Sequence, residues 1–119
     1  MATLTPTLTL TSTDTLTDAL SVTTTTDLTV TNPSEFSRKV VATGSAQTVI
    51  ASNSSFSYVY IRVVSGANSS DWLQVKLGGH SKIKIRVGEF AFFPLYNAQA
   101  ITAEAYGGAC VLEYGAWTI

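Results

Sequence analysis

The amino-terminal 31 residues carry fourteen threonines and a regular comb of apolar residues on even positions. The comb consists of Leu4, Leu8, Leu10, Leu16, Leu20, Val22, Leu28 and Val30. A period of two residues is that of an extended β backbone, in which successive side chains point to opposite sides. The sequence therefore predicts an extended arm with one apolar face and one hydroxyl face.

Such an arm needs a surface to lie against. Fixing the backbone of about 30 residues costs about 30–60 kcal/mol, whereas burying eight Leu and Val side chains returns about 12–24 kcal/mol. Pairing with a neighbouring element or a neighbouring chain would supply the missing stabilisation. Fully extended, the arm would reach at most about 100 Å, enough to cross a neighbouring subunit.

The sequence Asn32-Pro33-Ser34 is a turn or linker signal. It divides the chain into an arm of residues 1–33 and a second domain of residues 34–119. In this domain short alternating runs predict strands at 40–41, 48–50, 56–64, 72–77, 82–87, 90–95, 100–106, 110–114 and 117–119, separated by turns. The run 56–64 is apolar on both faces and predicts a central strand.

Strands at such spacing are typical of a sandwich, a jelly roll or a small barrel. No segment has the 3.6-residue period of a helix. We therefore expect an all-β protein: a β-sandwich or jelly-roll-like domain with an extended amino-terminal arm and almost no helix.

Composition excludes several classes of function. A net charge of −1 creates no field that would recruit nucleic acid or an anionic membrane. No stretch approaches the ~18–20 apolar residues of a membrane span. The amino terminus has neither a basic region nor a continuous apolar core, so we expect no secretory signal. The single Cys110 excludes an internal disulfide and is consistent with synthesis in the cytoplasm.

Residues that could carry catalysis are few. His80 is the only histidine and lies in a Gly-Gly loop, where we expect a turn residue in solvent. Cys110 lies on the apolar face of a predicted strand, where cysteine behaves as a small hydrophobe. The eight acidic residues are scattered, and the spacings of known metal sites are absent. We expect no enzymatic activity, no cofactor, no metal and no small-molecule substrate.

Charged residues are segregated along the chain. Every Lys and Arg lies between Arg38 and Arg86, whereas the arm carries only Asp14, Asp18 and Asp27. Lys82, Lys84 and Arg86 project from one face of a predicted strand and form a candidate charged interface. This complementarity favours an arm that lies across the body of another copy. Alternatively, the three cations form a solvated face or protect a sheet edge against aggregation.

The aromatic residues form a second candidate site. Trp72, Tyr96 and Trp117 have the flat apolar rings on which a glycan could stack. The alternative interpretation is that they fill the core and contacts between subunits.

Four segments carry a resemblance to a known class of proteins. They are Met-Ala-Thr-Leu-Thr-Pro-Thr-Leu-Thr-Leu-Thr-Ser at the start, Leu-Thr-Val-Thr-Asn-Pro-Ser at 28–34, Gly-Glu-Phe-Ala-Phe-Phe-Pro-Leu at 88–95 and Ile-Thr-Ala-Glu-Ala-Tyr at 101–106. In these segments and in its plan the chain resembles small virion structural proteins of tailed bacteriophages. Within that group it is similar to capsid decoration, or cement, proteins, which are mostly β and commonly trimeric.

The resemblance implies a location and a partner. The protein would be made in the host cytoplasm and lie on the capsid surface of the virion. There a homotrimer would bind the major capsid protein and stabilise the head by bridging capsid subunits. Two alternatives stay open: a receptor- or glycan-binding module of a tail or fibre, and a head–tail connector or tail-tube subunit.

Overall fold

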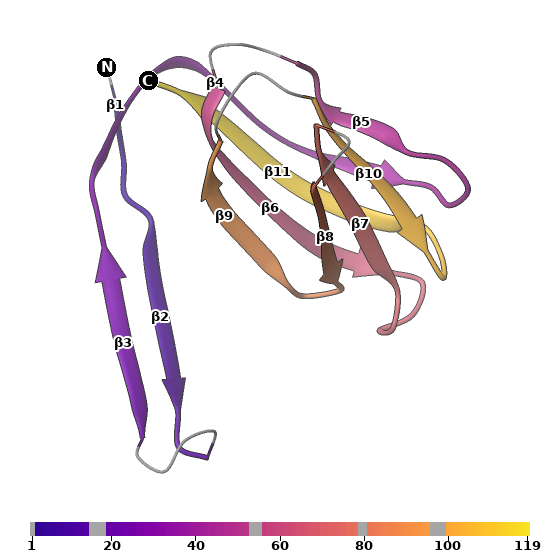
Figure 1. Ribbon diagram of the computed structural model, residues 1–119, viewed down its shortest axis with the longest axis horizontal. Helices are drawn as coiled ribbons and strands as arrows, with labels where there is room; N and C mark the ends of the chain where they lie inside the picture. Colours follow the sequence, from indigo (N-terminus) through magenta and orange to yellow (C-terminus); the bar gives the residue numbers. More distant parts are fainter. Residues whose placement is uncertain (1, 15–18, 53–55, 79–80, 96–99) are drawn as a thin grey trace. The chain divides into compact units, whose positions relative to one another are not determined.

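The computed structural model of the chain describes residues 2–14, 19–52, 56–78, 81–95 and 100–119, with residues 32–34 described by their backbone. These residues form strands and turns and no helix, so the protein is all-β as expected. The strands are β1 (Ala2–Leu4), β2 (Thr7–Ser12), β3 (Leu20–Thr25), β4 (Leu28–Val41), β5 (Gln47–Ile50), β6 (Phe56–Gly66), β7 (Trp72–Leu77), β8 (Ser81–Arg86), β9 (Phe90–Pro94), β10 (Ile101–Tyr106) and β11 (Cys110–Thr118). Figure 1 labels them. They divide into two compact units, Met1–Asn32 and Pro33–Ile119.

The first unit is a two-stranded antiparallel ribbon, residues 2–12 against residues 20–30. β1 pairs with the start of β4, and β2 pairs with β3. One register runs from the pair Ala2↔Val30 to the pair Ser12↔Leu20 without a shift. Directly opposed residues share a face. The even positions Leu4, Leu8, Leu10, Leu20, Val22, Leu28 and Val30 therefore lie on one face of the ribbon, and threonines dominate the other.

The comb thus has the two-faced geometry that its period predicts, but the arm is not one extended segment. It doubles back and pairs with itself, which satisfies about half of the backbone N–H and C=O groups of the two strands within the unit. Its length is then about 33 Å rather than about 100 Å. Leu16 lies outside the described residues.

The turn predicted at Asn32-Pro33-Ser34 is wrong, because β4 continues through it to Val41. The described pairing with β1 ends at Val30. Proline in a strand is usually confined to an edge, a first position or a bulge, so the sequence favours a turn here.

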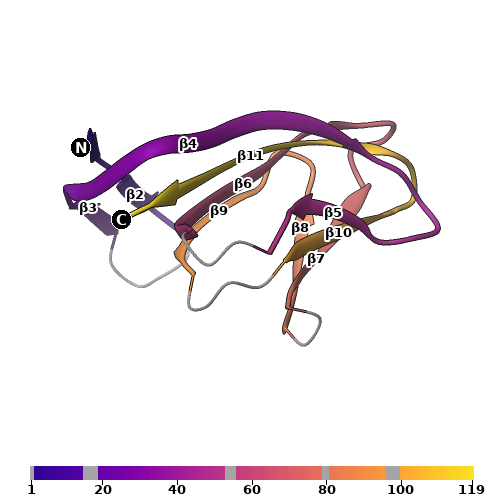
Figure 2. The same cartoon turned by 90° about the horizontal axis from the view of Figure 1, so that it is seen from above.

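The second unit is a β-sandwich of two antiparallel sheets, seen from the side in Figure 2. One sheet has the order β4-β11-β6-β9, with β1 beside β4, and the other has the order β5-β10-β7-β8. The neighbours are nested: β4 lies beside β11, β5 beside β10, β6 beside β9 and β7 beside β8. In the last two of these pairs, β8 and β9 are each an edge strand of their sheet.

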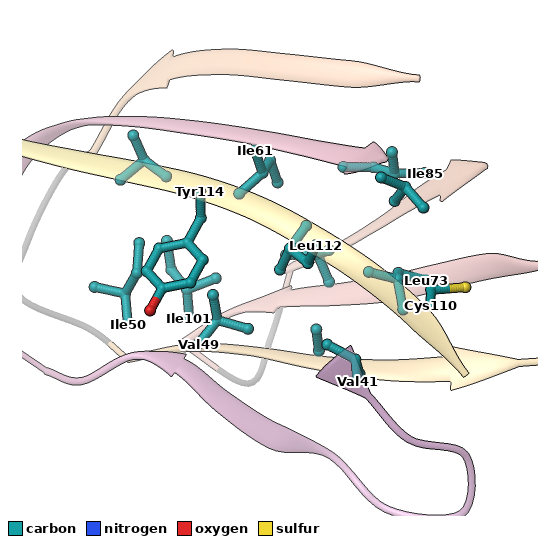
Figure 3. Close-up of a cluster of buried hydrophobic side chains, with 14 of the residues drawn as sticks. Val41, Val49, Ile50, Ile61, Leu73, Ile85, Ile101, Cys110, Leu112 and Tyr114 are labelled. Atoms are coloured by element: carbon teal, nitrogen blue, oxygen red, sulfur yellow. The ribbon is translucent and has the colours of Figure 1, made fainter. Parts of the chain in front are cut away.

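The core between the sheets is apolar and tightly buried. Inward positions of both sheets meet there, with Ile61 and Leu112 from one sheet and Leu73, Ile85 and Ile101 from the other (Figure 3). Ile61, Leu73, Ile101 and Leu112 have no exposed surface. Burial of such side chains contributes roughly 1.5–3 kcal/mol each, which makes this layer the main source of stability.

Most strands agree with the alternation in the sequence. The run at 56–64 lies within β6, which is paired on both sides as expected of a central strand. The predicted break between 110–114 and 117–119 is wrong, because β11 is continuous. Gly115 lies within this continuous strand. Aromatic rings occupy the space that a side chain at this position would fill.

Candidate interaction surfaces

An aromatic face covers the outer side of the sheet β4-β11-β6-β9. It consists of Phe36, Tyr58, Tyr60, Phe90, Phe92 and Trp117. Alternation in β6 explains it: Val59 and Ile61 point inward and are fully buried, so their neighbours point outward. The pairs Tyr60↔Phe92 and Tyr58↔Trp117 bring rings from β9 and β11 to the same side.

The rings of the aromatic face contact one another. Phe36 stacks on Tyr60 with ring centroids 6.1 Å apart, and Tyr58 stacks on Phe92 at 6.2 Å. Trp117 lies tilted against Phe92 at 6.4 Å. Phe36 and Phe90 are nevertheless each 61% exposed. Exposed rings on one outer face are typical of surfaces that bind a partner.

Gly115 makes room for this arrangement. It lies opposite Tyr60, and a Cβ built on it would be 2.6 Å from Cη2 of Trp117 and 2.9 Å from Cδ2 of Phe36. Both rings therefore lie over the bare backbone of β11. The sequence analysis missed this role of Gly115, and only the strand register reveals it.

A polar cluster lies on the same outer surface. The Glu113 carboxylate forms an ion pair with Arg38 at 3.0 Å and accepts a hydrogen bond from the Tyr60 hydroxyl at 3.1 Å. The Arg38 hydrogen bond, and then that of Tyr60, lowers the pKa of Glu113. Burial and the Glu113 carboxylate raise the pKa of Tyr60. The carboxylate thus links β4, β6 and β11.

The opposite outer surface, on the sheet β5-β10-β7-β8, carries the predicted cations. Lys82, Lys84 and Arg86 are all exposed on the edge strand β8, and we refer to them as the cationic edge. The sequence prediction that they point outward is confirmed, since Ile85 between them is 2% exposed. Their place on a free edge also fits a role in blocking edge-to-edge aggregation.

Trp72 joins the cationic edge to an aromatic pair. Its ring stacks on Tyr106 with centroids 4.4 Å apart, and the Lys84 Nζ lies 4.2 Å from its centroid. Tyr106 and Lys84 come from the strands on either side of β7. The Trp72 ring thus has both an aromatic and a cationic neighbour.

The three candidate stacking residues are not shown together. Trp72 lies on the outside of one sheet and Trp117 on the outside of the other. Tyr96 lies outside the described residues, as does His80. Among the three, Trp117 is the residue that the structure places in a wider aromatic surface.

A shallow groove runs between the two free edges β8 and β9. It has a volume of about 430 Å³, and its lining includes Ile83, Ile85, Phe90 and Ala91. In the described part of the chain, no group of three or more His, Cys, Asp or Glu residues is placed to hold a metal ion. Within the same residues, no helix has the length and apolar character needed to cross a membrane.

Asp71 is a buried carboxylate for which the scattered acidic residues of the sequence predicted no role. It is 2% exposed, and the backbone N–H of Asn68 donates to its Oδ2 at 2.8 Å. Its backbone oxygen accepts from the N–H of Val87 at 3.3 Å. The signal available in the sequence was the run Asn-Ser-Ser-Asp, in which a side-chain oxygen can close a turn.

Comparison of this chain with protein-family models, with curated proteins and with solved structures gave no match.

Proposed function

We propose that this chain is a non-enzymatic virion structural protein, a homotrimeric decoration protein that binds the major capsid protein and stabilises a phage head. The observation that carries the proposal is the pair of unlike outer faces on one small sandwich. One face is aromatic, built around Phe36, Tyr60 and Trp117, and the other carries the cationic edge. A protein that bridges subunits needs two such separate surfaces.

The strand order supports the same proposal. The nested neighbours β4–β11, β5–β10, β6–β9 and β7–β8 are those of a jelly roll, and we propose that the domain is one. Jelly rolls occur in viral capsid proteins and in lectins. The fold alone therefore does not distinguish a capsid role from a lectin role, and the surfaces of the domain must distinguish them.

Stabilisation of the head would follow from mass action. A protein that binds only the assembled shell lowers the free energy of that shell by an amount that grows with its concentration. The cationic edge is the surface proposed to meet the capsid protein, because exposed charges steer and orient a partner of opposite sign. The aromatic face then stays available for contacts between copies.

Binding to heads tests the proposal. Purified protein is added to heads that lack it, and bound protein is measured by sedimentation. We expect saturable binding that raises the temperature of head disruption. Replacing Lys82, Lys84 and Arg86 by Ser should weaken binding at least tenfold. The control replaces the exposed Thr43, Ser45 and Ser52 by Glu, which changes the net charge equally, and should bind like the parent protein.

Absence of binding to heads would contradict the proposal, as would immunogold label on tails of purified virions and none on heads. Equal weakening by both triple variants would show that net charge, and not the cationic edge, directs binding.

A second function is favoured by the position of Trp117 in the aromatic face. The chain would then be a receptor- or glycan-binding module of a tail or fibre. A glycan array decides between the two, since saturable sugar binding that is lost in Trp117→Ala and kept in Trp72→Ala would support a lectin.

For the connector or tail-tube alternative, the mass of the native oligomer separates a trimer from a hexamer or dodecamer.

A further inference from the structure

We infer that the apolar face of the ribbon in one copy packs on the aromatic face of a second copy. The inference names the partner of two surfaces within the proposed decoration protein, and it rests on that function only for its setting in the virion. Three observations lead to it: the exposure of the ribbon, the exposure of the rings and the segregation of charge.

The apolar face of the ribbon is exposed over much of β2 and β3, although Val30 on the same face is 2% exposed. Leu8, Leu10 and Val22 lie on this face and are 43%, 47% and 40% exposed. The opposite face of β2 and β3 consists of Thr7, Thr9, Thr11, Ser21, Thr23 and Thr25, all hydroxyl residues. A two-stranded ribbon is at best marginally stable in water. Covering the apolar face and leaving the hydroxyl face in solvent would stabilise it.

The aromatic face supplies a cover of matching chemistry. Phe36 and Phe90 are each 61% exposed, and Val40 on the same strand as Phe36 is 63% exposed. Leu and Val side chains pack well against ring faces, and burial of such surface is favourable whichever chain supplies it. Each copy thus has one apolar surface of each kind.

Net charge favours the pairing of unlike units over the pairing of like units. The ribbon sequence carries Asp14, Asp18 and Asp27 and no Lys or Arg, whereas the second unit carries all seven cations against five carboxylates. The exposed Arg62 lies beside Phe90 at the edge of the aromatic face. Two ribbons would repel each other, and so would two sandwich units, whereas a ribbon and a sandwich attract.

The contact has a direction, from the ribbon of one copy to the sandwich of the next. A heterologous contact of this kind closes into a ring when the rotation between copies permits it. A ring of three copies is the oligomer proposed for the protein. In such a ring every ribbon and every aromatic face is occupied.

The test uses the full chain and measures its oligomeric state by native mass spectrometry and light scattering. We expect a trimer for the parent protein. The variant Leu8→Thr, Leu10→Thr, Val22→Thr keeps residues suited to strands and removes the three exposed side chains of the apolar face, so its trimer should dissociate at least 100-fold more readily. The control Thr9→Ser, Thr11→Ser, Thr23→Ser alters the other face of the same strands and should remain a trimer.

A second variant tests the partner surface. Phe36→Thr with Phe90→Thr should dissociate the trimer as the ribbon variant does, and protection of Cys110 from thiol reagents will show that the sandwich stays folded. Mixing the two variants adds a check on direction. Each variant retains one intact surface. We therefore expect a mixed dimer, in which the intact ribbon of the Phe36→Thr, Phe90→Thr variant packs on the intact aromatic face of the variant with the changed ribbon.

A monomeric parent protein would overturn the inference, since the ribbon would then lie on its own sandwich or in solvent. Trimers unaffected by the ribbon variant would overturn it as well. These outcomes are independent of capsids. A ribbon-dependent trimer that fails to bind heads would contradict the decoration function alone, and head binding by a monomer would contradict this inference alone.

Discussion

The carboxylate of Asp71 lies directly against the backbone of Gly107, so that a Cβ at Gly107 would be 2.5 Å from Asp71 Oδ1. Gly107 has a φ of +92°, a conformation in which glycine is strongly favoured. With the bonds from Asn68 and Val87, the contact ties together the β6–β7 turn, the β10–β11 turn and the corner before β9. One buried aspartate thus holds one end of the sandwich.

Substitution of Gly107 by Ala should therefore destabilise the protein by about 2–4 kcal/mol, from backbone strain and from the clash with Asp71. Gly44 offers a matched control, since its φ is +95° and nothing lies within 4 Å of an added Cβ. Gly44→Ala should cost only about 1 kcal/mol of strain. Urea unfolding at fixed protein concentration measures both. Equal losses would show that Asp71 does not restrict this position.

Gly115→Ala should disturb the aromatic face and spare the core. The added methyl would force the rings of Trp117 and Phe36 to move, whereas Tyr114 and Ala116 on either side point into the core and stay buried. We expect a shift in the emission of Trp117, measured in a Trp72→Phe background, with a loss of stability below about 2 kcal/mol. Unchanged emission would contradict the close packing of Trp117 on Gly115.

The Arg38–Glu113 pair predicts a pH dependence. The pKa of Glu113 is lowered in the folded protein by Arg38 and Tyr60, so its contribution to stability is present above the ordinary glutamate pKa of about 4.3. It is lost as pH falls through the lowered value. Melting temperatures of the parent and Glu113→Gln should differ at neutral pH and converge as the pH falls below the lowered pKa of Glu113. Arg38→Gln should show the same convergence, and a constant difference across this range would exclude the pair as its cause.

Cys110 should be unreactive in the native protein. It has no exposed surface, and burial, with the nearby Asp71 carboxylate, raises the pKa of its thiol. Since the thiolate is the reactive form, labelling by a disulfide reagent at pH 8 should be at least 100-fold slower than in guanidinium chloride. Fast labelling under native conditions would mean that the end of the sandwich near Asp71 opens readily.

The strands of the sandwich could be predicted because one face of each is buried. In the segment from Lys82 to Arg86 every second residue is apolar, and the sandwich places Ile83 and Ile85 inward and the cations outward. The same alternation predicted the inward side of β10, where Ile101, Ala103 and Ala105 are buried. Burial on one side leaves a period of two in the sequence, and the period is enough to recover the strand.

The pairing of strands with one another leaves no comparable pattern in the sequence. The apolar comb is the same for a single extended arm and for a ribbon that folds back, because both have a period of two. Pro33 indicated a turn, yet a strand edge tolerates it. Nothing local joins Asp71 to Gly107 or Phe36 to Trp117, since these contacts depend on which strands and turns become neighbours.

Because its register is unbroken, the ribbon can change in length without a change in the residue types on its two faces. Because the two faces repeat every second residue, two further residues in each strand would lengthen the ribbon by about 7 Å and leave both faces unchanged. A shift of the pairing register by one residue would instead exchange the apolar and the hydroxyl faces of a strand. Insertions in even steps could thus adjust the span of this part to the spacing of the assembly around it, with no new side chains to accommodate.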